Sequence, residues 1–216
     1  MRPLQGRTDV AYLALSSDHV SPDIPTRCVR ELSDRGFAAV VTNALAPADA
    51  LPFLDAGFAV RERLDLLEHR MRTLPPTHRT IVRMRRADVA SVLTIDGLAF
   101  DDDWRLDSAG LADAIGATPV ARARIAHTHD REVLGYAITG RAGHRGYLQR
   151  VAVHPNVRRL GWGRAFVGDA LGWLRRHGVQ RTVVNTQVGN ASAHALYREC
   201  GFEPLPVGLC VLGRDL

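Results

Sequence analysis

The chain has 216 residues, of which 46% are hydrophobic and 24% are charged, a balance typical of a globular protein. No stretch approaches the roughly 18 uninterrupted apolar residues that a membrane span requires, so we expect a soluble chain with no membrane partner. The N-terminal residues lack an apolar run followed by a small-residue cleavage site, and we therefore expect a cytoplasmic location.

The chain has a net charge of +5. Its 28 basic side chains are all arginine and are scattered along the chain. A nucleic-acid partner favours a dense basic tract and is therefore disfavoured, whereas an anionic small ligand would account for part of the charge. The cysteines Cys28, Cys200 and Cys210 have neither metal-ligand nor redox-pair spacing. We expect free buried thiols and no metal site.

The N-terminal region carries a weak echo of the C-terminal region. Residues 35–43 resemble residues 177–185, and residues 53–58 resemble residues 197–202, with a two-residue gap between these blocks. We interpret the N-terminal region as a degenerate half-copy of the C-terminal fold, and chance similarity between two strand-helix-strand units is the alternative.

A domain boundary is predicted at Pro75 and Pro76, which break both helix and strand patterns. It separates a region 1–75 from a region 79–216. Beyond it, residues 80–85 alternate as a strand, and Asp88 is expected to cap a helix that begins at Val89.

The rest of the chain alternates between strand and helix periodicity. Ala165, Phe166, Leu171 and Leu174 lie on one apolar helical face. Helices are expected over 106–115, 161–177 and 190–200, strands over 120–127, 133–139, 146–153 and 181–186, and a final hairpin over 202–205 and 209–212. This order favours an α/β or α+β fold with one central, mixed, mostly antiparallel sheet flanked by helices.

The segment 151–165 runs from a strand through a basic loop with two glycines directly into a helix. Gly161 and Gly163 let the backbone approach a ligand closely, and the first-turn amides have no intrahelical partners. The helix dipole adds positive potential, so a pyrophosphate is the natural ligand. The Rossmann glycine spacing and the Walker pattern are both absent, which disfavours nucleotide binding of those two kinds.

Here the sequence resembles the GNAT superfamily of N-acetyltransferases, whose acyl-CoA loop reads Arg or Gln, two residues, Gly, one residue, Gly or Ala. Residues 158–163 fit this pattern, and residues 190–202 resemble the family's Asn-x-x-Ala-x-x-Leu-Tyr-x-x-x-Gly-Phe. The order of elements over 79–216 agrees as well, so the resemblance covers about two-thirds of the chain. It implies a GNAT fold with acetyl-CoA as co-substrate.

The resemblance also implies roles for individual residues. The backbone of Val151 and Val153 would bind the pantetheine arm and the acetyl carbonyl, and Asn190 would cap a short helix and contact the cofactor arm. Tyr197 would protonate the departing thiolate, with a purely structural place in the core as its alternative. The expected site comprises Tyr197 for catalysis and, for the cofactor, Val151, Ala152, Val153, Arg158, Arg159, Leu160, Gly161, Trp162, Gly163, Arg164 and Asn190.

The general base is not assigned. In the ribosomal-protein alanine acetyltransferase branch, which the chain resembles in pattern, a glutamate stands five residues before the motif asparagine, and here that position is Asn185. An asparagine cannot accept a proton at neutral pH, which also makes a ribosomal substrate doubtful. Trp104 lies where the superfamily builds its acceptor pocket. Remaining candidates, each also consistent with plain surface exposure, are Asp101, Asp102, Asp103, His127, His129 and Glu203.

The expected function is transfer of an acetyl group from acetyl-CoA to a primary amine, on a small molecule, a peptide or a protein N-terminus, by direct attack in a ternary complex. The alternative is a non-catalytic acyl-CoA-binding sensor or interaction module. A third reading is a tandem enzyme resembling mycothiol synthase, whose N-terminal copy binds no CoA because residues 21–25 lack glycines. The acceptor, the acyl-chain preference and the oligomeric state, including a homodimer, stay open.

Overall fold

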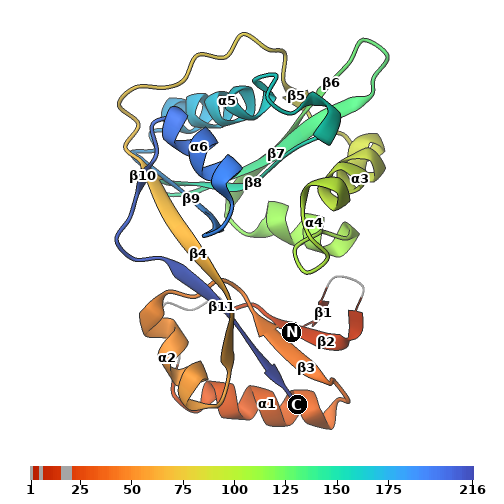
Figure 1. The fold of residues 1–216 in the computed structure, drawn as a ribbon, viewed down its shortest axis with the longest axis vertical. Helices are drawn as coiled ribbons and strands as arrows, with labels where there is room; N and C mark the ends of the chain where they lie inside the picture. The colour runs from red at the N-terminus through yellow and green to blue at the C-terminus, as the bar shows by residue number, and fades with distance from the viewer. Residues whose placement is uncertain (1, 5–6, 16–20) are drawn as a thin grey trace. The chain divides into compact units, whose positions relative to one another are not determined.

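The computed structural model describes residues 2–4, 7–15 and 21–216, which form two compact units (Figure 1). The first unit contains the described residues up to 66 together with 185–190 and 205–216. The second unit contains residues 67–184 and 191–204. Neither unit is one continuous stretch of sequence, and the boundary predicted at Pro75 stays a prediction.

The first unit is a sheet with two helices. Its strands follow the order β1-β2-β3-β11-β4, with β2 and β3 parallel and the other pairs antiparallel. Its core includes Leu32, Phe53 and Leu212, all fully buried. The elements are β1 (Arg2–Leu4), β2 (Arg7–Leu13), α1 (Ile24–Asp34), β3 (Ala39–Thr42), α2 (Pro47–Asp55), β4 (Ala59–His69) and β11 (Leu209–Asp215).

The second unit is a sheet with the order β9-β8-β7-β6-β5, to which the end of β4 and β10 add a further antiparallel pair at Leu67 and Glu68. The β8–β9 pair is parallel, whereas the β5–β6, β6–β7 and β7–β8 pairs are antiparallel. The elements are β5 (Val82–Arg83), η1 (Arg86–Asp88), α3 (Val89–Ala99), α4 (Ser108–Gly116), β6 (Val120–His127), β7 (Val133–Ala142), β8 (Arg145–Val153), η2 (Pro155–Val157), α5 (Trp162–Arg176), β9 (Arg181–Gln187), α6 (Ala191–Glu199) and β10 (Glu203–Pro204).

Helices cover both faces of the second unit's sheet (Figure 1). Helices α5 and α6 pack on one face, where Leu174 and Tyr197 share a cluster with Leu148 of β8. Helices α3 and α4 pack on the other, where Ile95 and Leu111 share a cluster with strand residues. The predicted apolar face of α5 is confirmed, since Ala165, Phe166, Leu171 and Leu174 are all buried.

Strand β8 separates from β9 partway along its length. The two strands pair only from Arg145 to Tyr147 of β8. On the β7 side the register shifts so that Arg150 lies opposite Ile138 and Leu148 lies opposite Thr139, which leaves Gln149 as a bulged extra residue. A bulge bends a strand and increases its twist, so it accounts for the divergence at this point.

One prediction about local structure is wrong, and another is confirmed for the position of the cap only. The C-terminal segment forms no hairpin with itself, because β10 pairs with β4 and β11 pairs with β3 and β4. Asp88 is the N-cap residue of α3, which begins at Val89 as predicted, but its side chain makes no capping hydrogen bond. Its carboxylate accepts from the backbone N–H of Arg85 at 2.6 Å. At the start of α4, Asp107 does cap through its side chain, which accepts from Gly110 N–H at 2.7 Å.

The two echoing sequence blocks form the same local structure. After α1 and after α5 the chain turns through a glycine with positive φ, and Phe37 N–H and Val179 N–H donate back to Leu32 and Leu174. The ends of α2 and α6 repeat the pattern at Phe58 and Phe202, which donate to Phe53 and Tyr197. This hydrogen bonding is the Schellman helix ending. The half-copy interpretation is consistent with these matches and stays a prediction.

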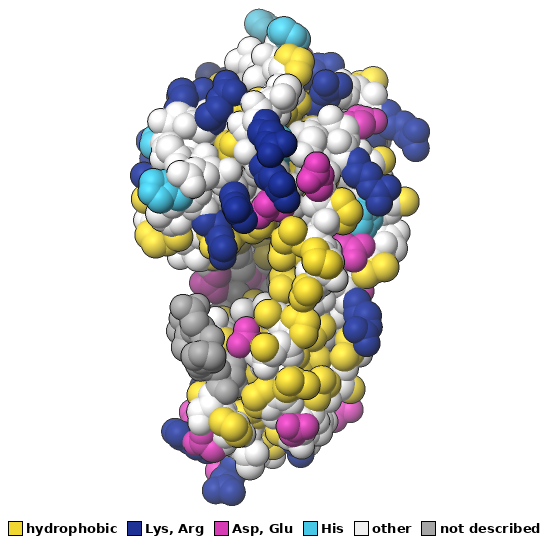
Figure 2. Space-filling view, turned by 90° about the vertical axis from the view of Figure 1, so that its left-hand side faces the viewer, with side chains coloured by type: hydrophobic (Ala, Val, Ile, Leu, Met, Phe, Trp, Pro, Cys, Tyr) yellow, Lys and Arg dark blue, Asp and Glu magenta, His cyan; other side chains and the backbone are white. Residues whose placement is uncertain are grey.

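The two units differ on the face of the molecule that Figure 2 draws. There, arginine side chains gather over the second unit and hydrophobic side chains over the first. Large exposed apolar residues of the first unit are Leu51, Leu54, Val60, Val188 and Val207.

The cysteine prediction needs a correction. Cys200 is buried, but Cys28 and Cys210 are only partly buried, whereas three buried thiols were expected. Within the described residues, no helix combines the length and apolar character that crossing a membrane requires.

Candidate active site

The loop between β8 and α5 has a backbone that is built around Gly161. This residue is the N-cap of α5 and has φ +83°, in the left-handed region. A side chain there would have open space, because the nearest atom to a Cβ would be Arg79 Nε at 4.0 Å. The glycine is therefore required for its backbone angle and not for room.

Six consecutive backbone amides in this loop, from Arg159 to Arg164, donate no hydrogen bond to any residue that the structure describes. The first helical bond is made by Ala165 N–H, which donates to Gly161 C=O at 3.0 Å. Unpaired amides at a helix N-terminus, together with the helix dipole, form an anion site. The exposed guanidinium groups of Arg158, Arg159 and Arg164 add positive charge. These residues fit a pyrophosphate.

Arg79 holds this loop from outside the motif. Its guanidinium lies 4.3 Å from the ring centroid of Trp162 and donates a hydrogen bond to Leu160 C=O. Two residues after Arg79, Ile81 belongs to a hydrophobic cluster with Phe166 and Trp162. The sequence analysis missed Arg79, because a single arginine before a short strand carries no pattern.

The open edge of β8 leads to the same loop. Beyond Tyr147, the residues 148–153 have a strand partner on the β7 side only, among the described residues. Their other backbone groups are free to pair with an extended ligand, as an added strand would. The Val151 side chain meanwhile packs against the cluster that contains Tyr197.

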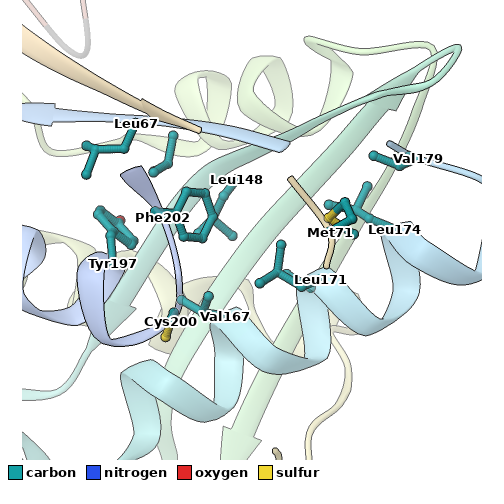
Figure 3. Packing of buried hydrophobic residues seen from close by; sticks show 12 residues of the cluster. Leu67, Met71, Leu148, Val167, Leu171, Leu174, Val179, Tyr197, Cys200 and Phe202 are labelled. Carbon is teal, nitrogen blue, oxygen red and sulfur yellow. The ribbon is translucent and has the colours of Figure 1, made fainter. Parts of the chain in front are cut away.

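Tyr197 lies in α6 among the apolar residues of the second unit, and its ring centroid is 5.7 Å from that of Phe202 (Figure 3). Its neighbour Leu196 packs on the first turn of α5, where a Cβ on Gly163 would stand 3.0 Å from Leu196 Cδ2. The structure therefore brings Tyr197 to the same end of α5 as the loop.

The chemistry of Tyr197 is set by burial. Its side chain is 7% exposed, and its hydroxyl donates no hydrogen bond to a described residue. Burial raises the pKa of Tyr197 well above that of an ordinary tyrosine, and the nearby Cys200 raises it further. The phenol consequently keeps its proton throughout the neutral range and can act as a donor.

A buried ion pair supports the other face of β8. Asp96 of α3 is fully buried and binds Arg150 through two hydrogen bonds of 2.8 and 2.9 Å. Tyr136 also donates to Asp96, and the Arg150 guanidinium lies 3.5 Å from the centroid of the Phe100 ring. The sequence analysis singled out none of these three polar residues, since each stands alone in its own element.

This ion pair also fixes the loop between α3 and α4. Arg150 donates to Trp104 C=O at 2.6 Å, and Leu106 N–H donates to the carboxylate of Asp96. The exposed acidic run 101–103 lies in the same loop, where Asp102 pairs with Arg105. The predicted acceptor region around Trp104 is therefore anchored to β8.

The remaining predicted residues are dispersed. Asn185 is exposed in β9, and Asn190 immediately precedes α6; both belong to the first unit. His127 lines a cavity at the β5 edge, and His129 and Glu203 are exposed. No hydrogen bond or ion pair between described residues joins these last three side chains to the β8–α5 loop. No group of side chains suited to a metal ion occurs among the described residues.

The β8–α5 loop, the open strand edge and the buried tyrosine occur within a segment that matches a known family. Residues 91–202 match the model of the acetyltransferase (GNAT) family, and the chain belongs to this family. The predicted family and the predicted α/β fold with a mixed, mostly antiparallel sheet are confirmed.

Three individual proteins show how far the likeness extends. The aminoglycoside N(6')-acetyltransferase type 1 of Stenotrophomonas maltophilia is 31% identical over 112 residues, which cover 48% of this chain and 70% of that protein. A GCN5-related N-acetyltransferase from Kribbella flavida has a TM-score of 0.64 at 18% identity, over 94% of this chain and 80% of its own. A ribosomal-protein-alanine N-acetyltransferase from Escherichia coli has a TM-score of 0.51 at 21% identity, over 63% and 92%.

Proposed function

We propose that this chain transfers an acetyl group from acetyl-CoA to a primary amine, by direct attack of the amine while both substrates are bound. The observation that carries the proposal is the row of six unpaired amides at the start of α5, next to a buried tyrosine whose hydroxyl is uncommitted. Anion binding and proton donation are thus available at one end of one helix.

Each part of the site has a physical task. Acetyl-CoA supplies the acetyl group as an activated thioester. The amides from Arg159 to Arg164 hold its pyrophosphate, and the open edge of β8 at Val151 and Val153 pairs with the pantetheine arm. Tyr197 keeps a proton on its hydroxyl oxygen and gives it to the sulfur as negative charge develops there.

The amine must be neutral when it attacks, because an ammonium has no lone pair. Asn185 cannot take the proton, so acceptors whose amine pKa lies near or below the assay pH should react best by positioning alone. The acidic run 101–103 favours acceptors that carry additional positive charge. Aminoglycosides are among the first acceptors to try, because one relative is named as an aminoglycoside acetyltransferase.

The test is thiol release from acetyl-CoA against aminoglycosides, polyamines, amino acids and peptides with free N-termini. Tyr197→Phe should reduce kcat by about a hundredfold, the lower range for a lost general acid, and leave the Kd for CoA within twofold. Tyr12→Phe, in the first unit, is the control and should keep full turnover. Equal turnover in Tyr197→Phe and the wild type would show that the hydroxyl is not the proton donor.

A non-catalytic acyl-CoA-binding module is the second candidate, favoured by the asparagine at position 185. It predicts tight CoA binding with no thiol release from any acceptor in the panel. Absence of CoA binding would contradict both candidates.

A further inference from the structure

A cationic cavity lies at the β5 edge of the second unit's sheet. It has a volume of about 600 Å³. Strand β5 and the turn η1 form one wall, and the end of β6 with the following turn forms the other. Since β6 is two strands from β8 in the sheet order, this cavity is built from different residues than the loop 158–164.

Four arginines surround this cavity: Arg83, Arg85, Arg86 and Arg131. All four are exposed, and none of their guanidinium groups forms an ion pair or hydrogen bond with a described residue. The cavity therefore collects four positive charges that form no ion pair within the described residues.

A single carboxylate, that of Asp88, lines the same cavity. It accepts the hydrogen bond from Arg85 N–H at 2.6 Å, so it is already engaged with the backbone. Helix α3 begins at the next residue, Val89, and its dipole adds positive potential to this wall. The net charge at the cavity is thus about three positive units, which calls for a ligand with several negative charges.

The floor of the cavity is apolar. Val82, Met84 and Ile125 contribute it, and Ile125 is 2% exposed. A volume of this size lies within the range of small-molecule sites and is far larger than one phosphate needs. Guanidinium groups bind the oxygens of phosphate and carboxylate alike in a bidentate manner. A phosphate group carries more negative charge than a carboxylate, so two or more phosphates on one small molecule match this excess of positive charge best.

We propose that this cavity, defined by Arg83, Arg85, Arg86 and Arg131, binds a small organic molecule that carries two or more phosphate groups, at the same time as acetyl-CoA occupies its own site. The arginines hold the phosphates, and the apolar floor receives the organic part. The proposal rests on CoA binding but not on acetyl transfer, because the two sites share no residue.

The test uses inorganic tripolyphosphate as the probe, titrated by calorimetry into protein that is already saturated with CoA. We expect one further site per chain, with affinity that falls steeply as salt is raised. Inorganic monophosphate should bind at least tenfold more weakly. Absence of a second site, or equal affinity for the two probes, would overturn the proposal.

Two variants locate the site. Arg83→Glu/Arg86→Glu and the milder Arg83→Gln/Arg86→Gln should each weaken tripolyphosphate binding at least tenfold and leave the Kd for CoA unchanged. Arg30→Glu/Arg145→Glu is the matched control, because it makes the same charge change as the first at two exposed arginines outside the cavity. An equal loss in this control would reveal non-specific attraction and overturn the proposal. A parallel loss of CoA affinity in the cavity variants would make the cavity part of the cofactor site.

Discussion

Single buried residues of the second unit have protonation states that the fold, and not the solvent, determines. Tyr197 keeps its proton because burial raises its pKa. His69 is 2% exposed, its Nδ1 accepts from Met71 N–H at 3.0 Å, and its Nε2 lies 3.1 Å from Thr73 C=O. That arrangement requires the neutral ring, and burial lowers the pKa of His69.

The raised pKa of Tyr197 predicts the alkaline side of the pH–rate profile. A general acid works in its protonated form, so a raised pKa extends activity to higher pH. We expect kcat for acetyl transfer to show no decline up to about pH 10, the ordinary tyrosine pKa, once the pH is high enough for the acceptor amine to be neutral. Steady-state rates from about pH 6 to about pH 10.5, which bracket that value, would measure this. A descending limb near neutral pH that disappears in Tyr197→Phe would contradict it.

The lowered pKa of His69 predicts a loss of stability in mild acid. Between the lowered pKa in the folded state and the ordinary pKa of 6.5 in the unfolded state, His69 is protonated in the unfolded chain but not in the folded chain. The contribution of His69 to stability is therefore present above pH 6.5 and is lost as pH falls toward the folded-state pKa. Urea unfolding on both sides of this pKa should show a decline of up to about 1.4 kcal/mol per pH unit. His69→Gln should flatten this decline, and the exposed His129→Gln should not. Equal slopes in all three proteins would refute the assignment.

At the scale of elements, the site depends on how α5 begins and on how α3 is joined to β8. The start of α5 requires a left-handed backbone at Gly161, and the α3–β8 contact is a buried charge pair between Asp96 and Arg150. The first is a departure from regular helix geometry, and the second is a buried charge pair in an otherwise apolar interface.

The left-handed N-cap can be tested with Gly161→Ala. An alanine at φ +83° costs about 1 to 2 kcal/mol, so the loop should relax and the Kd for CoA should rise about tenfold. Gly143→Ala is the matched control: this glycine has φ +55°, lies in the β7–β8 turn, and has open space on the side where a Cβ would stand. It should lose stability to a similar degree without changing CoA affinity. Unaltered CoA binding in Gly161→Ala would argue against this loop as the phosphate site.

The buried ion pair can be tested with Asp96→Asn. Arg150 would then remain buried without a counter-charge, and we expect a loss of about 3 to 5 kcal/mol in the free energy of unfolding. Adding Arg150→Met should restore part of that loss. By comparison, Asp102→Asn, in an exposed pair with Arg105, should change stability by less than about 1 kcal/mol. Urea titrations measure all of these variants, and a harmless Asp96→Asn would show that the pair contributes little.

The sequence predicted the elements whose pattern lies within a short stretch of residues. It did not predict features that depend on residues far apart in the sequence. Strands β6 to β8 and helix α5 were predicted because their periodicity and end signals are local. The final hairpin was wrong because β11 pairs with strands far away in sequence: Leu212 N–H donates to Thr42 Oγ1, 170 positions earlier. The α5 loop could be found from its motif, whereas Arg79, Asp96 and Arg150 converge only in three dimensions.

At the scale of the whole molecule, each compact unit is completed by a later stretch of the chain. The first unit includes β11, between β3 and β4, and the second includes residues 191–204, which contain α6 and β10. The stability of the first unit should therefore respond to single changes in β11.

Leu212→Ala tests this dependence. Leu212 is fully buried in the first unit's core, so its truncation should lower stability by about 2 to 5 kcal/mol. Hydrogen exchange should quicken first in β3 and the early part of β4. Val207→Ala, at a residue 53% exposed, is the control and should leave exchange unchanged. Exchange in β3 that is unaffected by Leu212→Ala would contradict the dependence.

The placement of β11 has a consequence for synthesis of the protein. While the ribosome is still making the second unit, β3 and β4 have already emerged but lack the strand that lies between them. The edges of β3 and β4 stay unpaired, and the apolar surface around Phe53 stays exposed, while more than a hundred further residues are translated. At about 5 to 20 residues per second this takes several seconds or longer. Nascent chains stalled before Leu209 should consequently be the species on which a chaperone acts.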